Sequence, residues 1–127
     1  MKSLKQIYKI NAPIELVWKA LTDQKLIKSW SGSNAKMSDK HEKFSLWDDQ
    51  IYGKNIEIIK EKKLVQEWFS SGFEEASMVT FELKQDKNKT IVTLNHKNIP
   101  DNEFKGIEEG WKVYYMNPLK KLVESLV

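Results

Sequence analysis

His96 is the residue whose type and position most directly suggest chemistry, because an imidazole can gain or lose a proton near neutral pH. It alternates with Val92 and Leu94 in a β-like segment, so its side chain is expected to face inward. In a pocket, such an imidazole could bind a polar group of a ligand or act as an acid or base. A histidine whose hydrogen bonds are satisfied at a strand end is the alternative, and the sequence leaves both open. His41 lies in a polar stretch and is predicted to be exposed.

Other reactive groups are too scattered to form a recognisable catalytic or metal site. The chain has no cysteine, and its two histidines lack the spacing of a metal-binding pair. Neither a nucleophile elbow nor a glycine-rich phosphate loop occurs. The paired acids Asp48-Asp49 and Glu74-Glu75 fall in predicted turns, where solvation explains them better than acid–base work. We therefore predict no catalytic residue, no metal and no cofactor, and we leave enzymatic activity open while favouring its absence.

Aromatic side chains supply a different signal. The chain contains five tryptophans, which can fill a core or form the walls of a cavity equally well. If a cavity exists, it is expected between the sheet and the C-terminal helix, with its mouth near Pro118 or near the loop after Trp30. In that case His96 and Tyr115 could orient one polar group of a ligand. The predicted lining is Trp30, Tyr52, Trp68, Phe81, His96, Trp111 and Tyr115.

The elements that must position these side chains begin with a strand and two short helices. Residues 2–10 alternate weakly between polar and apolar, as a half-buried strand does. Pro13 suits the start of a helix, because its missing N–H would have no partner there in any case. Thr22 or Asp23 can cap a second short helix, which carries Trp30 and ends in loop residues 31–34.

The middle of the chain is predicted to be an antiparallel meander. Residues 43–47, 51–60, 64–70, 76–84 and 90–97 are short segments rich in β-branched and aromatic residues, separated by polar turns. A further strand is predicted around residues 35–41. After residue 104 the apolar period changes to three and four, which predicts one long helix, with a kink where Pro118 interrupts it.

Composition bounds the class of protein. With 127 residues, 40% of them hydrophobic and 31% charged, the chain is expected to form a single domain over residues 1–127. Its basic residues are all lysine, interleaved with acids to a net charge of +3, and no arginine is available for bidentate recognition of guanine or phosphate. We therefore predict no nucleic-acid partner. No apolar run approaches the ~18 residues of a membrane span, and we expect a cytoplasmic protein without a signal peptide.

Residues spread over nearly the whole chain, each weak by itself, together resemble a known family. They are Ala12-Pro13, Val17-Trp18, Ala20-Leu21-Thr22-Asp23, Trp30, Gly53, Trp68, Thr90, His96, Ile99-Pro100 and Gly110-Trp111. This pattern is similar to the activator of the heat-shock-protein-ninety ATPase homologue-like family, within the superfamily of START-related lipid-transfer and polyketide-cyclase domains. The resemblance implies an α+β helix-grip fold, in which a curved antiparallel sheet embraces a long C-terminal helix and two short helices follow the first strand.

Three functions are compatible with these observations. The leading hypothesis is a protein that binds a small hydrophobic molecule in a cavity between the sheet and the C-terminal helix. The second, implied by the resemblance, is a protein-interaction module of the co-chaperone type that stimulates a chaperone ATPase. The third is a cyclase- or hydrolase-like enzyme, as found elsewhere in the superfamily. The sequence does not identify the ligand.

Overall fold

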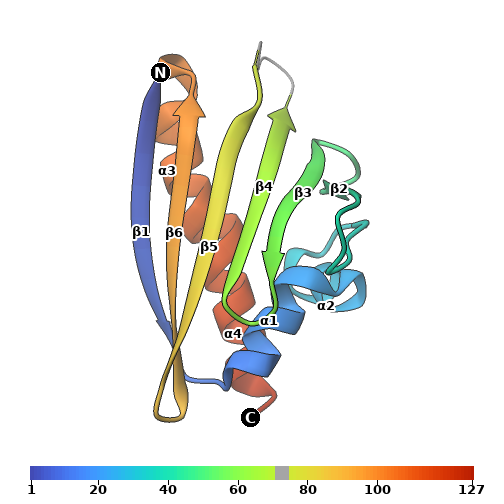
Figure 1. The fold of residues 1–127 in the computed structure, drawn as a ribbon, viewed down its shortest axis with the longest axis vertical. Helices are drawn as coiled ribbons and strands as arrows, with labels where there is room; N and C mark the ends of the chain where they lie inside the picture. Colours follow the sequence, from blue (N-terminus) through green and yellow to red (C-terminus); the bar gives the residue numbers. More distant parts are fainter. Residues whose placement is uncertain (71–74) are drawn as a thin grey trace.

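An antiparallel sheet forms one layer of the molecule, and helices cover one of its faces (Figure 1). The computed structural model describes residues 1–70 and 75–127, so Glu74 of the second acidic pair lies outside the described residues. In the described part of the chain, the sheet has six strands in the order β1-β6-β5-β4-β3-β2. They are β1 (Lys2–Ile10), β2 (Lys43–Leu46), β3 (Ile51–Ile59), β4 (Lys63–Ser70), β5 (Ser77–Asp86) and β6 (Lys89–Ile99). All neighbouring pairs are antiparallel.

The strands coincide with the predicted segments to within a few residues at their ends, except around residues 35–41. The strand predicted there does not form, and Lys36 makes only an isolated bridge with Ser45. The physical reason is that a side chain, rather than a neighbouring strand, binds the backbone carbonyls of this segment. The Asn55 amide nitrogen donates to the carbonyls of Ser38 and Lys40, at 3.0 and 2.9 Å, and holds this segment as a loop.

Two short helices connect β1 to the far edge of the sheet. They are α1 (Ile14–Thr22) and α2 (Gln24–Ser31). The Asp23 carboxylate accepts hydrogen bonds from the backbone N–H groups of Lys25 and Leu26 and thereby caps α2. The Thr90 hydroxyl donates to the carbonyl of Ala12, at 2.8 Å, which ties the entry to α1 onto β6.

The C-terminal helix runs along one face of the sheet in several consecutive segments (Figure 1). A 3-10 turn, η1 (Asp101–Glu103), leads into α3 (Phe104–Gly110), the π-helical segment η2 (Trp111–Met116) and α4 (Asn117–Ser125). The distortion therefore lies before Pro118, which occupies the first turn of α4. A proline has no N–H to donate and crowds the preceding turn, and the wider π geometry relieves that conflict inside a continuous helix.

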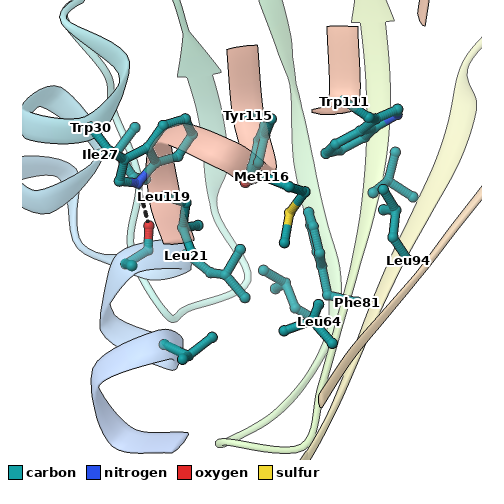
Figure 2. Close-up of a cluster of buried hydrophobic side chains, with 14 of the residues drawn as sticks. Leu21, Ile27, Trp30, Leu64, Phe81, Leu94, Trp111, Tyr115, Met116 and Leu119 are labelled. Carbon is teal, nitrogen blue, oxygen red and sulfur yellow. Dashed lines mark hydrogen bonds between the residues drawn. The ribbon is translucent and has the colours of Figure 1, made fainter. Parts of the chain in front are cut away.

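Side chains from the three helices and the sheet meet in one core (Figure 2). Leu21, Ile27 and Trp30 come from α1 and α2, while Leu64, Phe81 and Leu94 come from the inner face of the sheet. Trp111, Tyr115, Met116 and Leu119 come from η2 and α4. The Trp30 indole N–H donates to the carbonyl of Ala20, at 2.9 Å, which fixes α2 against α1.

This arrangement confirms the predicted helix-grip fold. The sheet has one face against the long C-terminal helix, and the two short helices follow the first strand as expected (Figure 1). Within residues 1–70 and 75–127, no helix has the length and apolar character that crossing a bilayer requires.

Candidate functional site

A groove opens between the C-terminal helix and the sheet. Its volume is about 370 Å³, which is in the lower part of the range for small-molecule sites. One wall comes from α3 and η2, and the other comes from β4, the start of β3 and the turn before it. We call this site the aromatic groove, and its lining consists of Trp47, Gln50, Ile51, Trp68, Gly106, Ile107, Gly110, Trp111, Tyr114 and Tyr115.

Two stacked indoles form the centre of the aromatic groove. Trp68 points inward from β4 and lies against Trp111 of η2, with ring centroids 4.9 Å apart and planes inclined by 30°. Both indole N–H groups are already bound inside the protein. Trp68 donates to the Gln66 side-chain oxygen at 2.8 Å, and Trp111 donates to His96 Nδ1 at 2.9 Å. An occupant of the groove therefore meets the faces of these rings rather than their N–H groups.

His96 is buried behind this wall, with 1% of its surface exposed. Because Nδ1 accepts from Trp111, the proton of the neutral ring must lie on Nε2, which is 2.8 Å from the Ser77 hydroxyl oxygen. Burial lowers the pKa of His96 to about 4, since the imidazolium form would lose its hydration. In this tautomer Nε2 donates to Ser77 and cannot take a proton from it. The pair therefore lacks the arrangement of an activated nucleophile, and His96 serves to orient Trp111.

Tyr115 reaches from the C-terminal helix into a group of aromatic rings (Figure 2). Its ring centroid lies 4.6 Å from that of Trp30, 4.7 Å from that of Trp111 and 5.7 Å from that of Phe81. The Tyr115 hydroxyl is buried and finds no hydrogen-bond partner in the described part of the chain. Burial also raises the pKa of Tyr115, so the hydroxyl keeps its proton and remains a donor.

The helical wall of the groove contains two glycines, which carry no side chain. Gly106 and Gly110 lie one turn apart on α3, and a Cβ added at either position would meet no atom within 4 Å. Gly110 has an ordinary helical φ of −59°, so its backbone does not require glycine. A glycine inside a helix costs roughly 0.5–1 kcal/mol relative to alanine. Neither local geometry nor packing against this chain requires glycine at these two positions, and both lie in the lining of the groove.

The residues predicted to line a cavity occupy three different environments. Trp68, Trp111 and Tyr115 line the aromatic groove. Trp30, Phe81 and His96 are buried behind that lining as part of the core. Tyr52 lies outside both groups, because it is 49% exposed and stacks on Phe69 of the neighbouring strand, at 5.7 Å.

The remaining lining residues were not predicted. Trp47 and Gln50 belong to the turn before β3, and Tyr114 is an exposed residue of η2. A π-helical turn brings Tyr114 and Tyr115 to the same groove, and hydrophobic periodicity based on 3.6 residues per turn does not anticipate this. The available signal was Gly106 and Gly110, since two glycines at i and i+4 in a helical pattern indicate a bare stripe on one face.

A second cavity, of about 610 Å³, lies between the two short helices, the loop at residues 37–39 and the turn after β3. Its lining mixes charges of both signs, including Lys19, Lys25, Asp39 and Glu61. The Asp23 carboxylate, also in this lining, is already engaged in capping α2. This composition describes a hydrated depression better than a site for one class of ligand, so the aromatic groove is the stronger candidate.

Comparisons with known proteins agree with the architecture. The family model described as Activator of Hsp90 ATPase homolog 1-like protein matches residues 11–124. Among solved structures, an HSP90 activator from Plasmodium falciparum is similar, with a TM-score of 0.90 and 27% sequence identity, over 98% of this chain and 97% of that one.

Two curated relatives are similar over most of this chain but are much longer. Activator of 90 kDa heat shock protein ATPase homolog 1 from Homo sapiens is 27% identical over 122 residues, which is 94% of this chain and 36% of the human protein. The Hsp90 co-chaperone AHA1 from Saccharomyces cerevisiae is 25% identical over 120 residues, 87% of this chain and 34% of the yeast protein. The chain thus spans about a third of the length of these relatives.

Proposed function

The chain belongs to the Activator of Hsp90 ATPase homolog 1-like family, and from this premise we propose that it binds a small hydrophobic molecule in the aromatic groove. The observation that carries the proposal is that one groove combines two stacked indoles with a stretch of bare helix backbone. Trp68 on the sheet side and Trp111 on the helix side present apolar rings, and Gly106 and Gly110 leave the helical wall beside Trp111 without side chains. Such a site suits a molecule that is held mainly by apolar contact.

The burial of the groove's indole N–H groups supports the same proposal. Gln66 and His96 fix the two rings from behind, so the wall exists before a ligand arrives. A preformed wall loses little conformational freedom on binding, which favours affinity. Five of the ten lining residues carry large apolar side chains, and Tyr114 and Tyr115 add two further rings. The five are Trp47, Ile51, Trp68, Ile107 and Trp111.

A fluorescent probe tests this proposal. We expect the neutral apolar dye N-phenylnaphthylamine to bind with micromolar affinity, to quench tryptophan emission and to raise the melting temperature. In the Gly110→Leu variant, the added Cβ meets no atom within 4 Å, and the rest of the leucine side chain should extend into the groove and occupy it. Lys105→Leu is the matched control, since it adds the same side chain at an exposed α3 position outside the lining. Binding that survives Gly110→Leu unchanged would contradict the proposal.

A chaperone partner is the second candidate, and the similarity to the two co-chaperones supports it. The Homo sapiens and Saccharomyces cerevisiae relatives are described as an activator of a 90 kDa heat shock protein ATPase and as an Hsp90 co-chaperone. If this chain shares that activity, ATP turnover by a purified 90 kDa chaperone should rise on its addition. The same assay with Gly110→Leu would show whether the activity depends on the aromatic groove. Unchanged turnover, together with no retention of the chaperone by the immobilised chain, would remove this candidate.

A further inference from the structure

The polar groups that the aromatic groove offers are few. The N–H groups of Trp68 and Trp111 are bound to Gln66 and His96, so neither can reach an occupant. Among the lining residues, the remaining polar side chains are Gln50 and the hydroxyls of two tyrosines. Recognition of a polar group in the groove therefore depends on very few atoms.

The Tyr115 hydroxyl is distinctive among these atoms. The Tyr115 side chain is 1% exposed, and its hydroxyl has no partner within the described residues. Leaving a buried donor without an acceptor is unfavourable, and a ligand that supplied an acceptor would recover part of that free energy. The Tyr114 side chain, by contrast, is 66% exposed, so water can satisfy its hydroxyl.

Trp47, in the turn between β2 and β3, packs against Tyr115. The two ring centroids are 6.0 Å apart. Trp47 has a φ of 48° in the turn between β2 and β3, a left-handed conformation that a bulky residue adopts at a cost. The other indoles around Tyr115 belong to helices or a strand, and hydrogen bonds from their N–H groups fix their rings. They are Trp30, Trp68 and Trp111. Because Tyr115 is 1% exposed, a ligand that reaches its hydroxyl must displace a neighbouring ring, and Trp47 is the indole among its neighbours without an N–H hydrogen bond in the described residues.

The charge of the lining restricts the ligand further. None of the ten lining residues carries a charged side chain. Transfer of an ionised group into such a site, without a countercharge, is strongly unfavourable. The bare stripe at Gly106 and Gly110 in turn suits a flat molecule that can lie against the helix backbone.

We infer that the aromatic groove takes a neutral, flat aromatic molecule that carries a hydrogen-bond acceptor oxygen, and that the Tyr115 hydroxyl donates to this oxygen. The inference rests on the proposed function, because it names the class of ligand for the same site. The apolar body of this molecule lies against the Trp68–Trp111 pair and the adjoining glycine stripe, and its acceptor faces Tyr115.

Three related probes test the chemistry of the ligand. Prodan is a neutral naphthalene ketone, its parent dimethylaminonaphthalene lacks the acyl group, and anilinonaphthalene sulfonate carries a permanent negative charge. In fluorescence titrations, wild-type protein should bind the ketone about five- to tenfold more tightly than the parent, as one added hydrogen bond permits. The sulfonate should bind more weakly than the ketone.

Two variants that each remove one hydroxyl test the role of Tyr115. Tyr115→Phe keeps the ring, and it should weaken ketone binding about five- to tenfold while it leaves the parent unchanged. Tyr52→Phe is the matched control, because it removes a hydroxyl from a partly exposed tyrosine that lies outside the groove. It should leave the affinity for both probes unchanged.

The outcomes separate this inference from the proposed function. If Gly110→Leu abolishes ketone binding but Tyr115→Phe does not weaken it, the acceptor inference is wrong and the groove remains a binding site. Tight sulfonate binding that Gly110→Leu abolishes would overturn the requirement for a neutral ligand. If no probe binds, or if binding is insensitive to Gly110→Leu, the proposed function fails and the inference fails with it.

Discussion

At the scale of single residues, His96 makes the stability of the protein depend on pH. Its pKa is lowered from 6.5 to about 4 in the folded protein, so the unfolded chain binds a proton more readily between these values. Stability due to this residue is fully present above pH 6.5 and is lost as the pH falls towards 4. The loss has an upper limit of about 3 kcal/mol.

Urea denaturation of wild type and His96→Gln between pH 7 and pH 4 checks this expectation. Glutamine can accept from Trp111 and donate to Ser77, as His96 does, but it does not titrate. The difference in free energy of unfolding between the two proteins should shift in favour of the variant as the pH falls. A difference that stays constant with pH would mean that His96 is not buried in its neutral form.

Tyr115→Phe should also reveal an effect on folding in the absence of ligand. The substitution removes a buried hydroxyl that has no partner in the described residues and leaves the ring contacts in place. We expect the free energy of unfolding to rise by about 1 kcal/mol, because a desolvated donor is no longer present. Thermal and chemical denaturation measure this change, and a clear loss of stability would show that the hydroxyl is satisfied.

At the scale of elements, the glycines of the helix and of the sheet should respond oppositely to alanine. Gly106→Ala and Gly110→Ala should each raise the free energy of unfolding by roughly 0.5–1 kcal/mol, since a Cβ meets no obstacle at either position. In Gly53→Ala, the Cβ would stand 1.7 Å from the backbone oxygen of Glu67. A shift of backbone is then unavoidable, and we expect a loss of about 1–3 kcal/mol.

Chemical denaturation of the three variants tests this contrast. If Gly110→Ala destabilises the protein, the helical wall is packed more closely than the structure describes. One of the two observations behind the proposed binding site, the bare helix backbone, would then be lost, whatever the result at Gly53.

At the scale of the whole molecule, the C-terminal helix should be required for cooperative folding. Five side chains of this helix are buried against the sheet and the two short helices, namely Trp111, Tyr115, Met116, Leu119 and Val123. The backbone N–H of Asn11 also donates to the Glu124 carboxylate, at 2.8 Å, and joins α4 to the end of β1. A chain that ends at Gly110 should lose its sharp thermal transition in circular dichroism. A truncated chain that melts cooperatively near the parent temperature would contradict this role.

Much of the fold could be predicted from the sequence, because the relevant signals are local. Alternation in the strands, the cap at Asp23 and the change of period after residue 104 each depend on residues close together in the chain. These signals gave the strand order along the chain, the two short helices and the long C-terminal helix, and the structure confirms them. The composition supplied five tryptophans but left open whether they fill a core or line a cavity.

Tertiary structure decided which aromatic residues share a groove. Trp111 and His96 are 15 residues apart, and their hydrogen bond sets both the tautomer of His96 and the direction in which Trp111 faces. Gly53 has no side chain, which lets the backbone of Glu67 approach it closely. The neighbouring Tyr52 stacks on Phe69, away from the groove. The π-turn brings Tyr114 and Tyr115 to the groove together. These outcomes depend on contacts between distant segments, and local periodicity carries no information about such contacts until the chain has folded.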